Sequence, residues 1–172
     1  MAIGPIAGQG RQFRFAVSAV QRQMAFRYHA SVFYSWRYAG AVPERLLILN
    51  DCVTVTGVIM DATINQPLRR ADGVRHEPDG DTHGWLRVDP QFANLLSAGN
   101  MSDQAGNLVW EMVCHFDVTQ ADSIAACSRY TDTQIIPPIG SHVAITGTFV
   151  QDVNHAAAWN EIHPVSRIAV LR

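Results

Sequence analysis

The most regular segment of the chain is residues 142–150, which read HVAITGTFV. Apolar side chains at every second position, from Val143 to Phe149, alternate there with more polar neighbours. Successive side chains of a β-strand point to opposite faces of a sheet, so this period of two predicts a strand with one buried face. Gly147 falls on that face, where a missing side chain lets the strand of a small barrel bend sharply.

Four more segments show strand-like patterns between turn residues. Gly57 repeats in the first of them the mid-strand glycine seen at Gly147, and Pro164 interrupts the start of the last. The turn Pro78-Asp79-Gly80-Asp81 leads into the second. The four predicted strands are residues 52–60, 84–88, 108–114 and about 161–170.

One helix is predicted in this part of the chain, over residues 118–128. Thr119 and Asp122 resemble a capping box at its start, with Asp in place of the usual Glu or Gln. Three strands, one helix and two strands in this order are the layout of the OB barrel. We therefore expect an all-β fold, a five-stranded OB-type β-barrel over residues 46–172 with one helix between its third and fourth strands.

Charge divides the chain into two parts. All 13 basic residues are Arg; residues 1–45 hold six of them against one acidic residue, a net charge of +5, and the rest holds seven against 14, a net charge of −7. Apolar residues at helical spacing from Phe13 to Met24 predict a helix within residues 11–38. We expect residues 1–45 to form a basic, amphipathic helical arm beside an acidic barrel.

Several roles fit such an arm. It resembles an organellar transit segment, because it is rich in Arg and poor in acidic residues, and no secretory signal is visible. It could also lie on an anionic membrane or contact nucleic acid. The simplest interpretation is that its apolar face packs on the barrel, on a protein partner or on another copy of the chain. No segment has the ~18 consecutive apolar residues of a transmembrane helix.

The three cysteines do not show a metal-binding spacing. Cys114 and Cys127 flank the predicted helix, so one disulfide between them is geometrically reasonable. Cys52 with Cys127 is a second option, and three reduced, buried thiols are a third.

Two groups of polar and aromatic side chains fall on alternate positions of two predicted strands, and the barrel can bring the groups together. Imidazole and carboxylate are common ligands of Zn²⁺, Mn²⁺ and Fe²⁺, so a divalent metal bound there is one interpretation of these residues. Hydrogen bonding and turn chemistry among the same residues is the structural alternative. The groups are Asp79, Asp81, His83, Trp85 and Arg87 in one, and Trp159, Glu161 and His163 in the other. The expected metal ligands are Asp81, His83, Glu161 and His163.

Aromatic and Arg side chains of the predicted barrel suit a ligand that stacks. OB barrels commonly bind oligonucleotides or oligosaccharides on the face of their second and third strands. The net charge of the barrel argues against nucleic acid, since a phosphate backbone needs a basic groove. His115 and Glu111 share one side of the third strand and are expected to face solvent. The expected ligand-binding residues are Trp85, Arg87, Trp110 and Trp159.

Short motifs over residues 45–170 resemble those of a family of small, uncharacterised prokaryotic OB-fold proteins. The most specific are Asp79-Gly80-Asp81-Thr82-His83 and Trp159-Asn160-Glu161-Ile162-His163-Pro164-Val165. The resemblance implies the OB fold and marks the Asp/His/Glu set, and it implies no particular activity. The family reads His-Gly-Trp before the closing motif, where this chain has His155-Ala156-Ala157-Ala158-Trp159. The other motifs are Arg45-Leu46, Cys52-Val53-Thr54-Val55-Thr56-Gly57, Leu108-Val109-Trp110-Glu111 and Gly140-Ser141-His142-Val143.

Two functions are therefore expected as alternatives. The first is an OB-fold binding or assembly module that docks on a protein partner or a second copy through residues 1–45. The second is a metal-dependent, phosphodiesterase-like hydrolase, in which the metal activates water and Arg87 holds a phosphate. Asp79-Gly80-Asp81-Thr82 also resembles a motif of thermonuclease-like OB enzymes, although their catalytic Glu is absent here.

Overall fold

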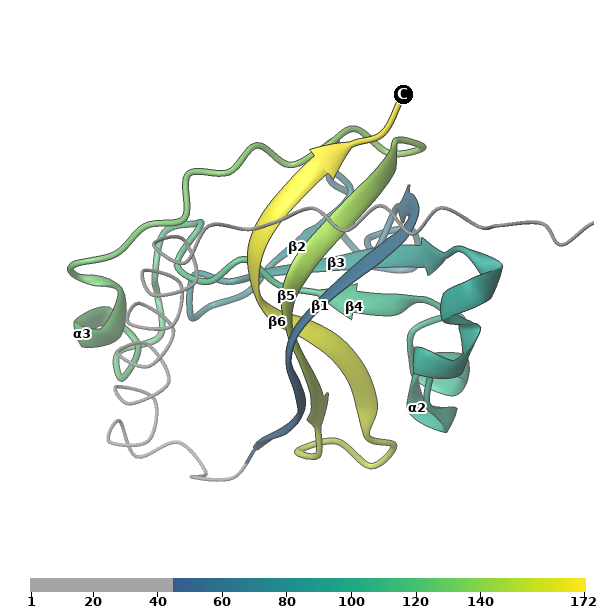
Figure 1. Cartoon of the computed structure of the whole chain (residues 1–172). Coiled ribbons are helices and arrows are strands. Elements are labelled where there is room, and N and C mark those ends of the chain that lie inside the picture. The colour runs from purple at the N-terminus through teal and green to yellow at the C-terminus, as the bar shows by residue number, and fades with distance from the viewer. Residues whose placement is uncertain (1–44) are drawn as a thin grey trace, which may run out of the picture.

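The computed structural model describes residues 45–172 of the chain. Five strands close into a barrel in the order β1-β5-β6-β4-β3, and a pairing between β1 and β3 completes the circle (Figure 1). All neighbouring strands are antiparallel except β4 and β6, which run parallel. The barrel strands are β1 (Leu46–Met60), β3 (Thr82–Val88), β4 (Leu108–Trp110), β5 (His142–Asp152) and β6 (Trp159–Val170).

The expected closed, five-stranded barrel is thus confirmed, and the described residues contain few and short helices. The predicted arm over residues 1–45, Arg45 apart, lies outside the described residues. No helix of residues 45–172 is long and apolar enough to cross a membrane.

The interior of the barrel holds the main hydrophobic core. Apolar side chains from all five strands meet there, and many are completely buried. A smaller apolar group on the opposite side of the same strands contains Trp85, Val109 and Trp159. The outer face of β3, β4 and β6 is therefore buried as well as the inner one. Fully buried core residues include Val55, Leu86, Trp110, Ile145 and Ile162.

The predicted helix over residues 118–128 is wrong in length. Only α3 (Ile124–Cys127) is helical, because Thr119 is used differently: its backbone N–H donates to the Pro78 carbonyl at 2.8 Å. A complete capping box occurs instead at the start of α2, where Ser97 and Asn100 cap each other. Three short elements were not expected from the sequence, namely β2 (Arg75–His76), a 3-10 helix (Pro90–Leu95) and α2 (Ala98–Asp103). In Figure 1, α2 and α3 lie at opposite ends of the barrel.

Strand boundaries also differ from those expected. β1 begins at Leu46, before the predicted start at Cys52, because its first half pairs with the end of β5. β4 ends at Trp110, before the predicted end at Cys114. The chain turns away beyond Trp110, and Cys114 has a positive φ of 54°. The Cys114–Cys127 disulfide is present, and Cys52 is free and exposed.

Gly57 marks the place where β1 crosses β3. A Cβ at this position would lie only 2.4 Å from the carbonyl oxygen of Arg87. We expect Gly57→Ala to lower the free energy of unfolding by about 1–3 kcal/mol, because the two backbones must separate. Urea denaturation measures this. Asp51→Ala, at an exposed position of the same strand, should change the free energy by no more than about 0.5 kcal/mol. Equal stability of the two variants would contradict the close crossing.

Candidate metal centre

A buried cluster of acidic and histidine side chains lies on the outer face of β3, β4 and β6. The parallel register of β4 and β6 sets Val109 beside Glu161, and the next residues of the same face are Glu111 and His163. β3 pairs with β4 on its other side and adds His83. Side chains from three strands far apart in sequence therefore meet at one place. We call Asp81, His83, Glu111, Glu161 and His163 the acid–histidine cluster; each is at most 5% exposed.

Glu111 is the centre of the contacts within the acid–histidine cluster. Its Oε2 lies 2.9 Å from Nδ1 of His163, and its Oε1 lies 3.2 Å from Nδ1 of His83. The same nitrogen of His163 is 3.1 Å from Oε1 of Glu161. Nε2 of His83 lies 3.0 Å from Oε1 of Gln104, which α2 and its following turn carry. Both imidazoles are thus held in fixed orientations by carboxylates.

Asp81 is the last member of the cluster, and only one of its two carboxylate oxygens accepts a hydrogen bond among the described residues. Its Oδ1 accepts a 2.7 Å hydrogen bond from the backbone N–H of Cys114. Its Oδ2 is buried and has no hydrogen-bond partner among the described residues; it lies 3.8 Å from Nε2 of His163. A buried carboxylate oxygen without a partner is costly unless a cation or a proton meets it.

The pKa values of the cluster diverge in the way expected for a crowded, dry group of charges. Burial raises the pKa of Asp81 well above its usual range, and His163 offsets this only in part. Burial, together with the charge of Glu111, also raises the pKa of Glu161. Burial opposes ionisation of Glu111 too, but attraction and hydrogen bonds from His163 and His83 outweigh it and lower its pKa. Glu111 is therefore the carboxylate that stays ionised.

The pKa values of the two histidines are both raised. Burial favours neutral imidazole, but the charge and hydrogen bonds of Glu111 outweigh it and raise the pKa of His163 well above its ordinary value. The pKa of His83 is raised for the same reason, although less. Glu111 and the two imidazoles thus stabilise the charged forms of one another.

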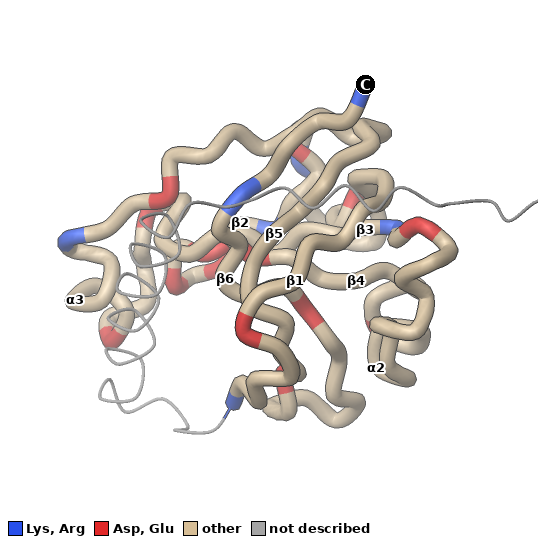
Figure 2. Tube along the Cα trace, viewed as in Figure 1, with Lys and Arg blue, Asp and Glu red and all other residues tan. Residues whose placement is uncertain are grey.

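A second ion pair adjoins the cluster. Arg45, the first described residue, places its Nη2 2.8 Å from Oδ2 of the fully buried Asp152. The same carboxylate lies 3.3 Å from Nε2 of His155. The acidic residues nearby, including Glu111 and Glu161, raise the pKa of Arg45 despite its burial. Figure 2 shows that acidic positions gather between β6 and α3, with few Arg among them.

Two of the expected ligand-binding aromatics lie beside the cluster, but neither is open to solvent. Trp85 is 5% exposed and Trp159 is 8% exposed. The Trp85 Nε1–H donates to Gln104, and Arg75 covers the ring at 5.4 Å. The Trp159 Nε1–H donates to Glu161, and the imidazole of His155 stacks on the indole at 3.8 Å.

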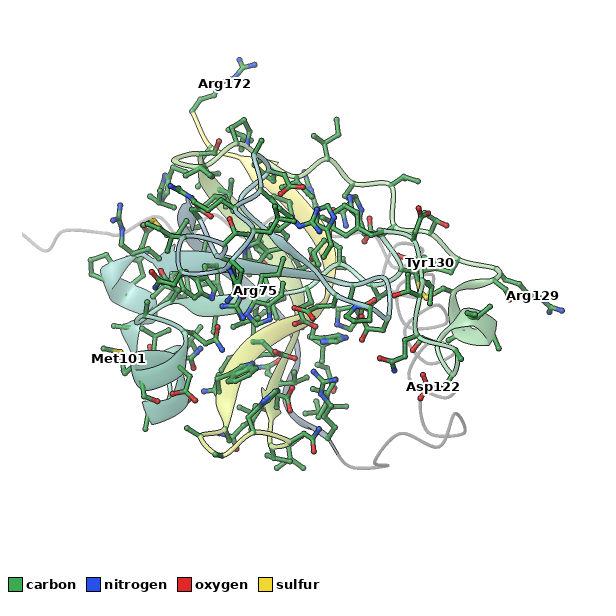
Figure 3. All side chains as sticks on the ribbon, turned by 180° about the vertical axis from the view of Figure 1, so that it is seen from behind. Arg75, Met101, Asp122, Arg129, Tyr130 and Arg172 are labelled. Atoms are coloured by element: carbon green, nitrogen blue, oxygen red, sulfur yellow. A yellow bond between two sulfur atoms is a disulfide. The ribbon has the colours of Figure 1, made fainter. Side chains whose placement is uncertain are left out.

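Arg75 is drawn over the middle of the barrel in Figure 3, whereas Asp122 and Arg129 project away from it near α3. The two indoles are thus held by hydrogen bonds and covered by Arg75 of β2 and by His155.

The structure separates the other two expected ligand-binding residues from the acid–histidine cluster. Trp110 points into the barrel core and is fully buried, since its ring fills the space left by Gly84. Arg87 is exposed and pairs with Val58 of β1, at the end of β3 remote from Glu111.

The four expected metal ligands do converge, but the sequence interpretation missed Glu111. Its expected exposure beside His115 is wrong. Glu111 continues the alternation of Val109 onto the outer face, but this face is covered, since the neighbouring β6 contributes Glu161 and His163 to it. The N–H of Glu111 donates to the carbonyl of Ile162 at 3.0 Å. His115 points elsewhere, with Nδ1 at 2.9 Å from the carbonyl oxygen of Asp132. The signal that could have found Glu111 is its place directly after a strand that neighbours β6.

Three members of the cluster are close enough together to hold a metal ion. Asp81, Glu111 and His163 each offer one ligand atom, and these atoms lie within 4.8 Å of one another. Carboxylate oxygen and imidazole nitrogen are suitable donors for Zn²⁺, Mn²⁺ and Fe²⁺. The donor set and the partnerless oxygen of Asp81 fit a divalent cation. Comparison of the chain with protein-family models and with curated proteins finds no match.

The Glu111 side chain is expected to matter for stability even without metal. Glu111→Ala leaves two histidines without their counter-charge and should cost about 3–5 kcal/mol of unfolding free energy. Asp117→Ala removes an exposed acidic residue a few positions away and should cost no more than about 0.5 kcal/mol. Urea denaturation in the presence of a chelator compares the two. A Glu111→Ala loss as small as that of Asp117→Ala would show that the contacts do not hold in solution.

The raised pKa of His163 gives a pH dependence with a definite sign. A group whose pKa rises on folding stabilises the fold below its ordinary value, about 6.5 for His, and this stability is lost as the pH rises through the folded value. In chelator-treated protein, unfolding free energy should therefore fall between pH 6 and pH 9, and His163→Gln should reduce the fall. The same decline in both proteins would exclude His163 as its source.

Proposed function

We propose that this protein is an OB-type binding module whose binding face carries a divalent cation. The observation that carries the proposal is Oδ2 of Asp81, a buried carboxylate oxygen without a hydrogen-bond partner among the described residues, aimed at His163 and within reach of Glu111. A cation between these three side chains would satisfy that oxygen and neutralise the excess of carboxylates.

The OB assignment is supported by the strand connections. The third and fifth barrel strands in chain order, β4 and β6, are parallel neighbours, and β1 pairs with both β3 and β5. OB barrels commonly bind their ligands on the face of the second and third strands, here β3 and β4. The acid–histidine cluster lies on that face. The motifs shared with the uncharacterised prokaryotic OB-fold proteins contain all five of its members, so we propose membership of that family.

Zn²⁺, Mn²⁺ or Fe²⁺ is the cation that the donors favour. Asp81, Glu111 and His163 would bind it. Glu161 contacts His163 and would orient it, as carboxylates commonly orient metal-bound histidines. His83 contacts Glu111 and would orient that carboxylate. Of the four ligands expected from sequence, Asp81 and His163 thus keep the direct role, and His83 and Glu161 take the supporting one.

A binding role suits the site better than the alternative of a phosphodiesterase-like hydrolase. A catalytic metal keeps an open position for water and substrate, whereas every side chain of this cluster is at most 5% exposed. Arg87, the residue expected to hold a phosphate, lies at the remote end of β3. The described residues also hold 14 acidic residues against eight Arg, which favours a protein or carbohydrate ligand over nucleic acid.

Residues 1–45 are proposed as the segment that docks on a protein partner or a second copy of the chain. The support comes from the strand that follows them. Leu47, Ile48 and Leu49 at the start of β1 are 45%, 55% and 50% exposed, an apolar run that single soluble domains usually cover. The proposed assembly role and the proposed metal centre are independent of each other.

Metal content tests the proposed function directly. We expect elemental analysis of untagged protein, purified without chelator, to find about one divalent metal per chain, and Asp81→Asn to lower the content at least tenfold. Asn keeps the acceptor for Cys114 and removes the charge, so the barrel should stay folded. Asp117→Asn is the matched control and should keep its metal. Wild-type protein that stays metal-free after incubation with Zn²⁺, Mn²⁺ and Fe²⁺ would refute the proposal.

A further inference from the structure

The turn that carries Asp81 is enclosed by the segment that follows β4. The N–H of Phe116 donates to the carbonyl of Gly80 at 2.8 Å. A Cβ at Gly80 would come within 2.9 Å of the Phe116 carbonyl oxygen, so the two backbones are in direct contact. The position of Asp81 therefore depends on how residues 112–127 are held.

Hydrogen bonds on the strand side of Asp81 tie it to the same segment. The N–H of Thr82 donates to the carbonyl of Met112 at 3.0 Å, and the N–H of Met112 donates to Oγ1 of Thr82 at 2.8 Å. The side chain of Asp81 then receives the N–H of Cys114. Asp81 is thus oriented by a backbone amide and not by another side chain.

Cys114 holds that amide in an unusual backbone conformation. Its φ of 54° is in the left-handed region, which residues other than glycine rarely adopt without support from their surroundings. The support present here is the bond from its Sγ to Cys127 at the end of α3, with Cα atoms 5.4 Å apart. Sγ of Cys127 also lies 3.6 Å from the carbonyl oxygen of Asp79, two residues before Asp81. The disulfide therefore contacts the Asp81 turn from both of its cysteines.

We propose that the Cys114–Cys127 disulfide is a redox-responsive part of the metal centre, so that its reduction lowers the affinity for the cation. Opening the bond frees Cys114 to leave the left-handed conformation, and Asp81 loses the amide that aims its second oxygen at His163 and Glu111. This inference rests on the proposed cation site. The proposed regulator of cation affinity is a dithiol reductant, either a small molecule or a protein.

The exchange is balanced by that dithiol alone. One thiolate attacks Sγ of Cys127, which is the more accessible sulfur because Cys114 is only 3% exposed. The S–S bond breaks, Cys114 leaves as a thiolate and takes up a proton, and a mixed disulfide forms at Cys127. The second thiol of the reductant then displaces Cys127. Two electrons and two protons pass from the dithiol to the protein, and the reductant ends as a disulfide.

Titration with Mn²⁺ alone tests the proposal, with free Mn²⁺ followed by electron paramagnetic resonance. Mn²⁺ is preferred to Zn²⁺ because newly formed thiolates bind zinc strongly. The full-length Cys52→Ala chain is the background, since it removes the exposed free thiol. We expect dithiol-reduced, alkylated protein and Cys127→Ser each to bind Mn²⁺ at least tenfold more weakly than the oxidised form. The oxidised Cys52→Ala chain should match oxidised wild type.

A second measurement needs no cysteine variant in the disulfide. If reduction weakens Mn²⁺ binding tenfold, saturating Mn²⁺ must stabilise the disulfide equally, which for a two-electron couple lowers its reduction potential by about 30 mV. Equilibration of the oxidised chain with a dithiol redox buffer, with and without Mn²⁺, measures this shift. A structural disulfide remote from the cation would show no Mn²⁺-dependent shift.

The outcomes separate this inference from the proposed function. Equal Mn²⁺ affinity in the oxidised and reduced forms overturns the redox coupling and leaves the metal centre standing. Absence of Mn²⁺ and Zn²⁺ binding in the oxidised form overturns the metal centre and the coupling with it. Loss of the β-sheet circular dichroism signal on reduction also overturns the coupling, because the disulfide would then support the whole barrel.

Discussion

The contact between Glu111 and His163 organises the outer face of the barrel. Water could in principle solvate this face, yet the charged groups on it are buried. Burial of a carboxylate is tolerated only when opposite charge and hydrogen bonds replace the lost water. Glu111 meets that requirement with two imidazoles at 2.9 and 3.2 Å. Glu161 shares Nδ1 of His163 with Glu111, and Gln104 contacts the other nitrogen of His83. The Trp85 and Trp159 indoles donate to the same Gln104 and Glu161, so the apolar and ionic parts of the face depend on each other.

Strand alternation was enough to predict the barrel, because period-two patterns survive wherever one face of a strand meets the core. It could not show that the outer face of β3, β4 and β6 is buried. Glu111 follows the three-residue strand β4, and the local pattern placed it on the solvent side with His115. Only the parallel pairing of β4 with β6, which no local pattern encodes, sets it against His163. The predicted helix before Cys127 failed for a related reason, since the hydrogen-bonding groups of Thr119 are used by Pro78, far away in sequence.

The metal ligands were predictable in part for a physical reason. Asp81, His83, Glu161 and His163 lie on alternate positions of two strands, so parity alone grouped them. Parity also grouped Trp85 and Trp159 correctly with that face. It could not separate Trp110 from them, because whether a strand residue points inward depends on the register with its neighbours. Trp110 can be buried because Gly84, on the neighbouring strand, has no side chain and leaves space for the indole ring.

The parallel pairing of β4 with β6 has a consequence for how the molecule comes into being. β6 is the last of the five barrel strands in chain order, and it contributes His163 and Glu161. A nascent chain that has made β1, β3 and β4 has Asp81, Glu111 and His83 but lacks His163, the histidine that contacts both carboxylates. These carboxylates must stay hydrated or protonated until the final strand docks between β5 and β4. Docking of β6, which closes the barrel, is thus the same event as charge compensation, so a product truncated before β6 cannot imitate this face of the protein.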